Sequence, residues 1–82
     1  MLKRSVLVNS FIDPANVALL VQIASKFSSH ISLVIEEKTA NAKSIMGLIS
    51  LDIRSGQTIN IVVDGEDEQQ ALPELTKFFQ TS

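Results

Sequence analysis

Residues 31–51 read ISLVIEEKTANAKSIMGLISL and contain three local patterns in succession. In residues 31–36 an apolar side chain recurs at every second position, which is typical of a strand with one buried face. Glu37-Lys38 can turn the chain into a short strand over residues 39–41. Ser44 then stands directly before an apolar run, as a helix N-cap does. The stretch therefore predicts two paired strands followed by a short helix.

The rest of the chain continues this alternation of strands and helices. Asp13-Pro14 marks a helix start, because Asp is a good N-cap and Pro is favoured at the first helical position. The other expected elements are a strand over residues 3–8, a loop over 9–13, a helix from 14 to about 27, a strand over 58–63, a turn over 64–68, and a last helix with Ala71, Leu72, Leu75, Phe78 and Phe79 as its apolar set.

Pro73 is the one residue that conflicts with this pattern. Inside a helix, proline removes a backbone hydrogen bond and costs about 3 kcal/mol. We therefore expect a distortion near residues 69–73.

The predicted order is β-α-β-β-α-β-α, with strands too short and too close together for parallel crossovers alone. This order indicates an α+β fold: a two-layer open-faced sandwich with a four-stranded antiparallel sheet and three helices on one face. A chain of 82 residues forms one domain, residues 1–82.

The composition excludes several classes of function. With no Cys and a single His, the chain offers neither a disulfide framework nor a thiolate or imidazole metal site, so we expect no metal and no cofactor. A net charge of -2 without a basic stripe argues against direct nucleic-acid binding. No apolar run is long enough to span a bilayer and no secretory signal is evident, so we expect a cytoplasmic protein without membrane contact.

Ser44 and the apolar run behind it form the main candidate site. The N-terminus of a helix carries partial positive charge, so a phosphate on Ser44 would fit there. The simpler interpretation is that Ser44 only caps the helix and that the apolar residues only fill a core. However, five apolar residues in seven positions are more than one face can bury, and we expect Ile45 or Met46 to face solvent.

Three blocks of the sequence resemble HPr, the phosphocarrier of the sugar phosphotransferase system. They are Val21-Gln22 with Ala24-Ser25-Lys26-Phe27, then Asn41-Ala42-Lys43-Ser44-Ile45-Met46-Gly47, and then Gly65-Glu66-Asp67-Glu68-Gln69 with Ala71-Leu72. The central block is similar to that of Gram-positive members, including the HPr paralogue Crh. The resemblance spans almost the whole chain and implies the same sandwich fold.

The resemblance fails in the loop where the family carries its phosphorylated His. In the segment Phe11-Ile12-Asp13-Pro14-Ala15-Asn16, Asp13 stands at the His position and Ala15 at the position of the adjacent Arg. The segment therefore has neither a nucleophilic imidazole nor a guanidinium clamp, and we expect no catalytic residue. Asp13 is expected to cap the following helix. Crh also lacks the His but keeps the Arg, so this chain departs further. His30 lies far from this loop and is expected to be a surface residue.

The block around Ser44, which this chain retains, is the regulatory part of the family's sequence pattern. The resemblance implies phosphorylation of Ser44 by an HPr kinase/phosphorylase, followed by docking on a transcriptional regulator such as catabolite control protein A in carbon catabolite repression. The expected docking residues are Leu19, Ile45, Met46 and Ile49. Two alternatives stay open: an interaction module that works without phosphorylation, and a phosphocarrier that uses Asp13 or another residue.

Overall fold

The computed structural model describes residues 1–9 and 13–81. Along this part of the chain the elements are β1 (Leu2–Leu7), α1 (Pro14–Ser25), β2 (His30–Ile35), β3 (Lys38–Asn41), α2 (Ile45–Leu51), β4 (Thr58–Asp64) and α3 (Glu68–Thr81). The predicted order β-α-β-β-α-β-α is therefore confirmed. The predicted loop over residues 9–13 is only partly covered, since residues 10–12 lie outside the described residues.

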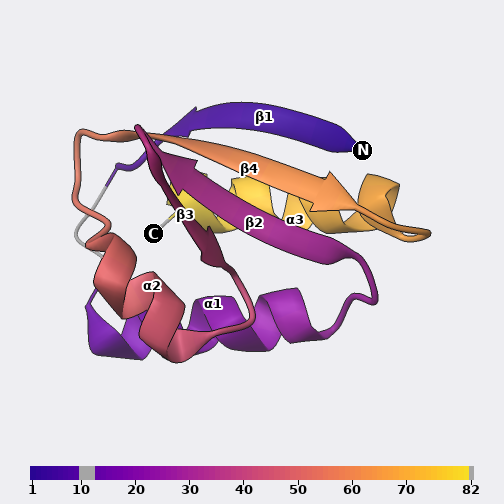
Figure 1. Cartoon of the computed structure of the whole chain (residues 1–82), viewed down its shortest axis with the longest axis horizontal. Helices are drawn as coiled ribbons and strands as arrows, with labels where there is room; N and C mark the ends of the chain where they lie inside the picture. Colours follow the sequence, from indigo (N-terminus) through magenta and orange to yellow (C-terminus); the bar gives the residue numbers. More distant parts are fainter. Residues whose placement is uncertain (10–12, 82) are drawn as a thin grey trace.

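The strands form a four-stranded antiparallel sheet in the order β1-β4-β2-β3. Figure 1 shows α3 behind β4 and β2, and α1 and α2 below them, as the helical second layer. The two central strands, β2 and β4, pair from His30 opposite Asp64 to Val34 opposite Asn60. The predicted α+β open-faced sandwich is the observed fold.

The core lies between the sheet and the helices. In β2 and β4, alternate side chains are buried and the others point toward the uncovered face of the sheet, as period-two patterning requires. From the helical layer, Leu20 of α1, Leu48 of α2 and Leu75 and Phe79 of α3 are fully buried against this face. The three helices are therefore held to the sheet by apolar packing.

Several element ends differ from the predicted ones by one or two residues. The first helix ends at Ser25, not at residue 27, because the amides of Lys26 and Phe27 bond back to Ile23 and Ala24, three residues earlier. The four strands run over 2–7, 30–35, 38–41 and 58–64, where 3–8, 31–36, 39–41 and 58–63 were expected. Cross-strand pairing decides these ends, and a single strand's pattern does not contain that information.

The turn between β2 and β3 is made by Glu36-Glu37, one residue earlier than expected. Glu36 adopts a positive φ of 54°, the conformation that the first central residue of a two-residue hairpin turn needs. Glutamate is disfavoured there, so nothing in the sequence pointed to Glu36 as the turning residue.

α3 runs through Pro73, and the distortion expected near residues 69–73 stays a prediction. The carbonyl that proline leaves without a helical partner is that of Gln69, and both residues are exposed, so water can bind it. Burial of Leu72, Leu75 and Phe79 on the opposite face stabilises the helix. Of the helices that the structure describes, none has the length and apolar character needed to cross a membrane.

Candidate functional site

Ser44 is the N-cap of α2. Its Oγ accepts a hydrogen bond of 3.1 Å from the backbone N–H of Gly47, and its carbonyl accepts one of 3.0 Å from Leu48. Its extended backbone (φ −114°, ψ 113°) is typical of a cap residue. The side chain is partly exposed, so a capping hydroxyl stands where solvent can reach it.

Gly47 leaves space around this hydroxyl. A β-carbon on Gly47 would lie 3.3 Å from Ser44 Oγ and 3.7 Å from the Cβ of Ala40. The first distance is tight and the second is ordinary van der Waals contact. A side chain at Gly47 would therefore fill the space between Ser44 and Ala40 of β3. Because Gly47 has no side chain, Ser44 Oγ stays uncovered on this side while it accepts the hydrogen bond from the Gly47 N–H.

The apolar run of α2 is divided between the core and the surface. Leu48 and Leu51 are buried, whereas Ile45 is 47% exposed, Met46 73% and Ile49 54%. Leu19, on the neighbouring helix α1, is 47% exposed. The expected exposure of Ile45 and Met46 is therefore observed. We call these four residues, Leu19, Ile45, Met46 and Ile49, the apolar surface.

Lys43 fixes the segment before Ser44 to the end of α1. Its Nζ donates a hydrogen bond of 2.7 Å to the carbonyl of Phe27, and its backbone N–H donates to Asn41 Oδ1 at 2.9 Å. No local sequence pattern indicates this role for Lys43, since the residues in contact are 16 positions apart. The contact holds α1 and α2 side by side, so that both sides of the apolar surface stay together.

Asp13 is the N-cap of α1, with Oδ1 accepting a 2.8 Å hydrogen bond from the N–H of Asn16. The carboxylate thus occupies the place where a helix N-terminus would otherwise receive an anion. Ala15, in the first turn, is exposed and offers no polar group. Phe11 and Ile12, from the same altered segment, lie outside the described residues.

His30 is separate from these helix termini. It is the first residue of β2, exposed, and paired in register with Asp64 of β4. Within the described ranges, no group of three or more His, Asp or Glu side chains is arranged to hold a metal ion.

The fold and the site together define a class of protein: a small open-faced α+β sandwich in which a helix-capping serine lies at the edge of an exposed apolar surface. A family model described as "PTS HPr component phosphorylation site" matches residues 14–81. The chain belongs to the HPr family.

Both HPr-like Crh proteins and HPr phosphocarrier proteins are similar to the chain. The HPr-like protein Crh of Halalkalibacterium halodurans is 49% identical over 63 residues, 77% of this chain and 75% of the relative. The phosphocarrier protein HPr of Treponema pallidum is 44% identical over 77% of this chain and 72% of its own length. The crystal structure of HPr-C-His from Thermoanaerobacter tengcongensis superposes with a TM-score of 0.94 at 34% identity, covering 99% of this chain and 93% of that one. These relatives are phosphocarrier or regulatory proteins, not enzymes in the usual sense.

Proposed function

We propose that this chain is a regulatory protein of the phosphotransferase system and of carbon catabolite repression. In this proposal an HPr kinase/phosphorylase phosphorylates Ser44 in the cytoplasm. The phosphorylated form then docks on a transcriptional regulator such as catabolite control protein A. The observation that carries the proposal is the position of the Ser44 hydroxyl, partly exposed at the head of α2 and directly before Ile45 and Met46.

Phosphorylation would change both the charge and the hydrogen bonding of this helix end. The Ser44 oxygen forms a bond to the γ-phosphorus of ATP, the bond to the β-phosphate oxygen breaks, ADP leaves and the hydroxyl proton is released. The Gly47 N–H, which now donates to Oγ, can then donate to a phosphate oxygen. A phosphoserine carries a charge of about -1.5 to -2, which the helix N-terminus stabilises.

The docking step follows from the composition of the same surface. Leu19, Ile45, Met46 and Ile49 expose apolar area that a partner can bury, and the phosphate adds a dianion at its edge. A partner that presents an apolar patch bordered by Arg or Lys would fit this combination, because charge-assisted bonds to phosphate are strong and directional.

We also propose that phosphocarrier chemistry is absent. One carboxylate oxygen of Asp13 already accepts the hydrogen bond that caps α1, and Ala15 supplies no guanidinium to hold a transferred phosphate. The phosphoenolpyruvate-dependent kinase of the system should therefore leave the chain unlabelled. A base-labile acyl phosphate on Asp13 would contradict this.

The test is incubation of the protein with an HPr kinase/phosphorylase and ATP, read by intact mass. One added phosphate is expected, absent from Ser44→Ala and present in Ser50→Ala, a matched control because Ser50 is exposed on the same helix. A known HPr labelled in parallel shows that the kinase is active.

A second candidate is an interaction module that needs no phosphorylation. Asp13 favours it, since its carboxylate group already caps the start of α1 without any phosphorylation. No phosphate on Ser44 in the kinase assay, together with regulator binding that is independent of ATP, would support this candidate over the first.

A further inference from the structure

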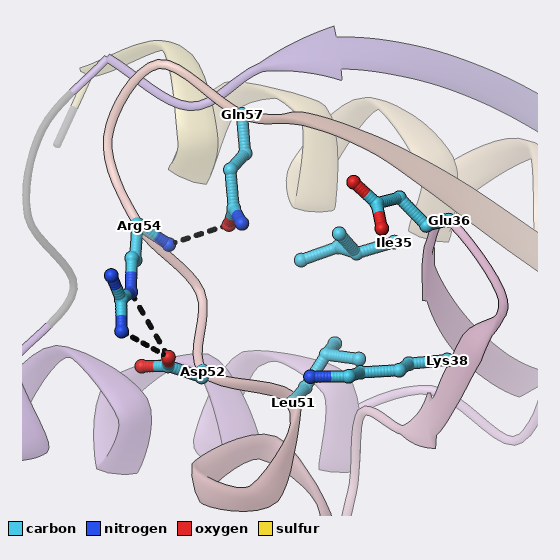
Figure 2. Close-up of a pocket in the computed structure, with 7 residues that line it drawn as sticks. All are labelled: Ile35, Glu36, Lys38, Leu51, Asp52, Arg54 and Gln57. Carbon is cyan, nitrogen blue, oxygen red and sulfur yellow. Dashed lines mark hydrogen bonds and ion pairs between the residues drawn. The ribbon is translucent and has the colours of Figure 1, made fainter.

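A hollow at the C-terminal end of α2 lies apart from Ser44, which caps the other end of the helix. Figure 2 shows it between the turn that joins β2 to β3 and the loop that joins α2 to β4. Its volume is about 160 Å³. Its lining residues are Ile35, Glu36, Lys38, Leu51, Asp52, Arg54 and Gln57. Ile35 and Leu51 are buried residues, so they give the hollow an apolar base.

One ion pair in this lining is already closed. Arg54 donates to Asp52 Oδ2 through Nε at 2.9 Å and through the guanidinium Nη2 at 2.7 Å. The same aspartate raises the pKa of the Arg54 guanidinium, through the hydrogen bond first and the charge second. The backbone N–H of Arg54 also donates to Gln57 Oε1 at 2.8 Å. That bond turns the Gln57 amide so that its NH₂ group faces the open space in Figure 2.

The other two charged side chains that line the hollow are those of Glu36 and Lys38. Among the residues that the structure describes, neither the Lys38 ammonium nor the Glu36 carboxylate takes part in an ion pair or a side-chain hydrogen bond. Both line the hollow, and they enter it from the same hairpin. The hollow thus offers one cation, one anion and one amide donor around an apolar base.

We propose that this hollow binds a small zwitterion, an α-amino acid with an aliphatic side chain. Its carboxylate would contact the Lys38 ammonium and the Gln57 amide, and its ammonium would contact the Glu36 carboxylate. The aliphatic side chain would lie on Ile35 and Leu51. A neighbouring hollow of about 320 Å³ shares Lys38 and Leu51 and has room for a longer side chain.

The size and the charge balance argue against other small ligands. A hollow of about 160 Å³ is smaller than the roughly 300–1,000 Å³ of pockets that hold drug-sized ligands, which favours a ligand as small as an amino acid. A phosphate dianion would meet a single free cation, Lys38, and would be repelled by Glu36. Net neutrality with separated charges is the property that a zwitterion complements.

The test is a ¹H–¹⁵N NMR titration of the whole chain with L-leucine. 4-Methylpentanoate, which is leucine without the ammonium group, and isoamylamine, which is leucine without the carboxylate, serve as the comparison ligands. Leucine should give saturable shifts confined to residues 35–38 and 51–57, with a Kd of about 1 to 10 mM, since the site is small and open to solvent. Each comparison ligand should bind about tenfold more weakly. Equal shifts with 4-methylpentanoate, or no saturable shift with leucine, would overturn the proposal.

Matched variants separate the hollow from general surface charge. Lys38→Gln and Glu36→Gln should each weaken leucine binding about tenfold, because each removes one charge-assisted contact. Lys3→Gln and Glu66→Gln remove exposed charges elsewhere and should change nothing. Unchanged affinity in Lys38→Gln and Glu36→Gln would refute the site. Ser44 is intact in all four variants, so this outcome is independent of the kinase assay.

Discussion

Gly65 lies so close to Ser29 that a β-carbon on Gly65 would stand 2.6 Å from the Ser29 Cα and 2.5 Å from its Oγ. Gly65 follows β4, and Ser29 precedes β2, so the contact joins two connections at one end of the sheet. Ser29 is buried, and its Cα belongs to the backbone, so neither side can move away easily. The position therefore requires glycine.

We expect Gly65→Ala to lower the free energy of unfolding by at least about 2 kcal/mol, because it combines a backbone clash with a φ of 157°. Urea unfolding followed by circular dichroism measures it. Gly56→Ala is the matched control: Gly56 has a φ of 89° but nothing within 4 Å of an added β-carbon. It should cost only about 1 kcal/mol of backbone strain. Equal losses in the two variants would show that the Ser29 contact is unimportant.

Asp67 strengthens the same junction. Its Oδ2 accepts a 2.8 Å bond from the Ser28 N–H, and its Oδ1 accepts a 3.0 Å bond from the Ser29 N–H and a further bond from the Ser29 hydroxyl. These bonds, with the Ser29 hydroxyl contributing most, hold the pKa of Asp67 below its ordinary value of 3.8. The folded state therefore binds a proton less readily than the unfolded state does.

The stability that Asp67 contributes is complete above the ordinary pKa and is lost as the pH falls through the lower, folded pKa. The midpoint of urea unfolding should therefore fall on acidification toward about pH 3. In Asp67→Asn the midpoint should be lower at neutral pH and should fall less steeply in acid. Glu66→Gln, at an exposed neighbour, should keep the full slope. An unchanged acid slope in Asp67→Asn would show that this carboxylate is not responsible.

The strands and the fold class were predictable because apolar side chains alternate along residues 31–35 and 59–63, and these apolar side chains are the buried ones. Asp13-Pro14 and Ser44 were predictable as helix starts, because capping is a local interaction. For Pro73 the sequence predicts a distortion but not the packing of Leu75 and Phe79, which stabilises α3 on both sides of the proline.

Contacts between distant parts of the chain could not be read from the sequence. The Asp67 bonds to Ser28 and Ser29 join residues 38 and 39 positions apart, and Lys43 reaches Phe27 from 16 positions away. The surplus of apolar residues in α2 predicted that some would be exposed. That Ile49 joins Ile45 and Met46 at the surface follows from how α2 lies on the sheet.

Glu36 should be a site of stabilising substitution. Its positive φ of 54° costs a non-glycine residue about 1 to 2 kcal/mol, and glycine would remove that cost while losing about 0.5 to 1 kcal/mol of chain entropy. We expect Glu36→Gly to raise the free energy of unfolding by up to about 1.5 kcal/mol. Glu37→Gly, the other turn residue, has no positive φ to relieve and should destabilise the protein. Thermal or urea unfolding of both variants decides the matter, and a Glu36→Gly that is less stable than the parent would contradict the argument.

Ser44 should matter for stability as well as for phosphorylation. Removing the cap in Ser44→Ala should cost about 1 kcal/mol, whereas Ser44→Asp keeps an acceptor for the Gly47 N–H and should be nearly as stable as the parent. Both variants lose the proposed phosphorylation site, so the urea midpoint separates them where the kinase assay does not. If Ser44→Ala were as stable as the parent, the hydroxyl would not act as a cap in solution.

Ala15 is where the proposed docking can be strengthened. The resemblance to HPr implies an Arg at this position, which would lie beside a phosphoserine and contact the regulator, and Ala15 is exposed in the first turn of α1. We expect Ala15→Arg to bind the regulator more tightly once Ser44 is phosphorylated, by about 1 to 3 kcal/mol or roughly 5- to 150-fold in Kd. Calorimetry with phosphorylated protein and catabolite control protein A measures the gain. Ala18→Arg, an exposed substitution on the same helix, controls for added charge. Because the added bond needs a phosphate nearby, the gain should vanish in the unphosphorylated protein, and an equal gain without phosphate would favour the phosphorylation-independent module.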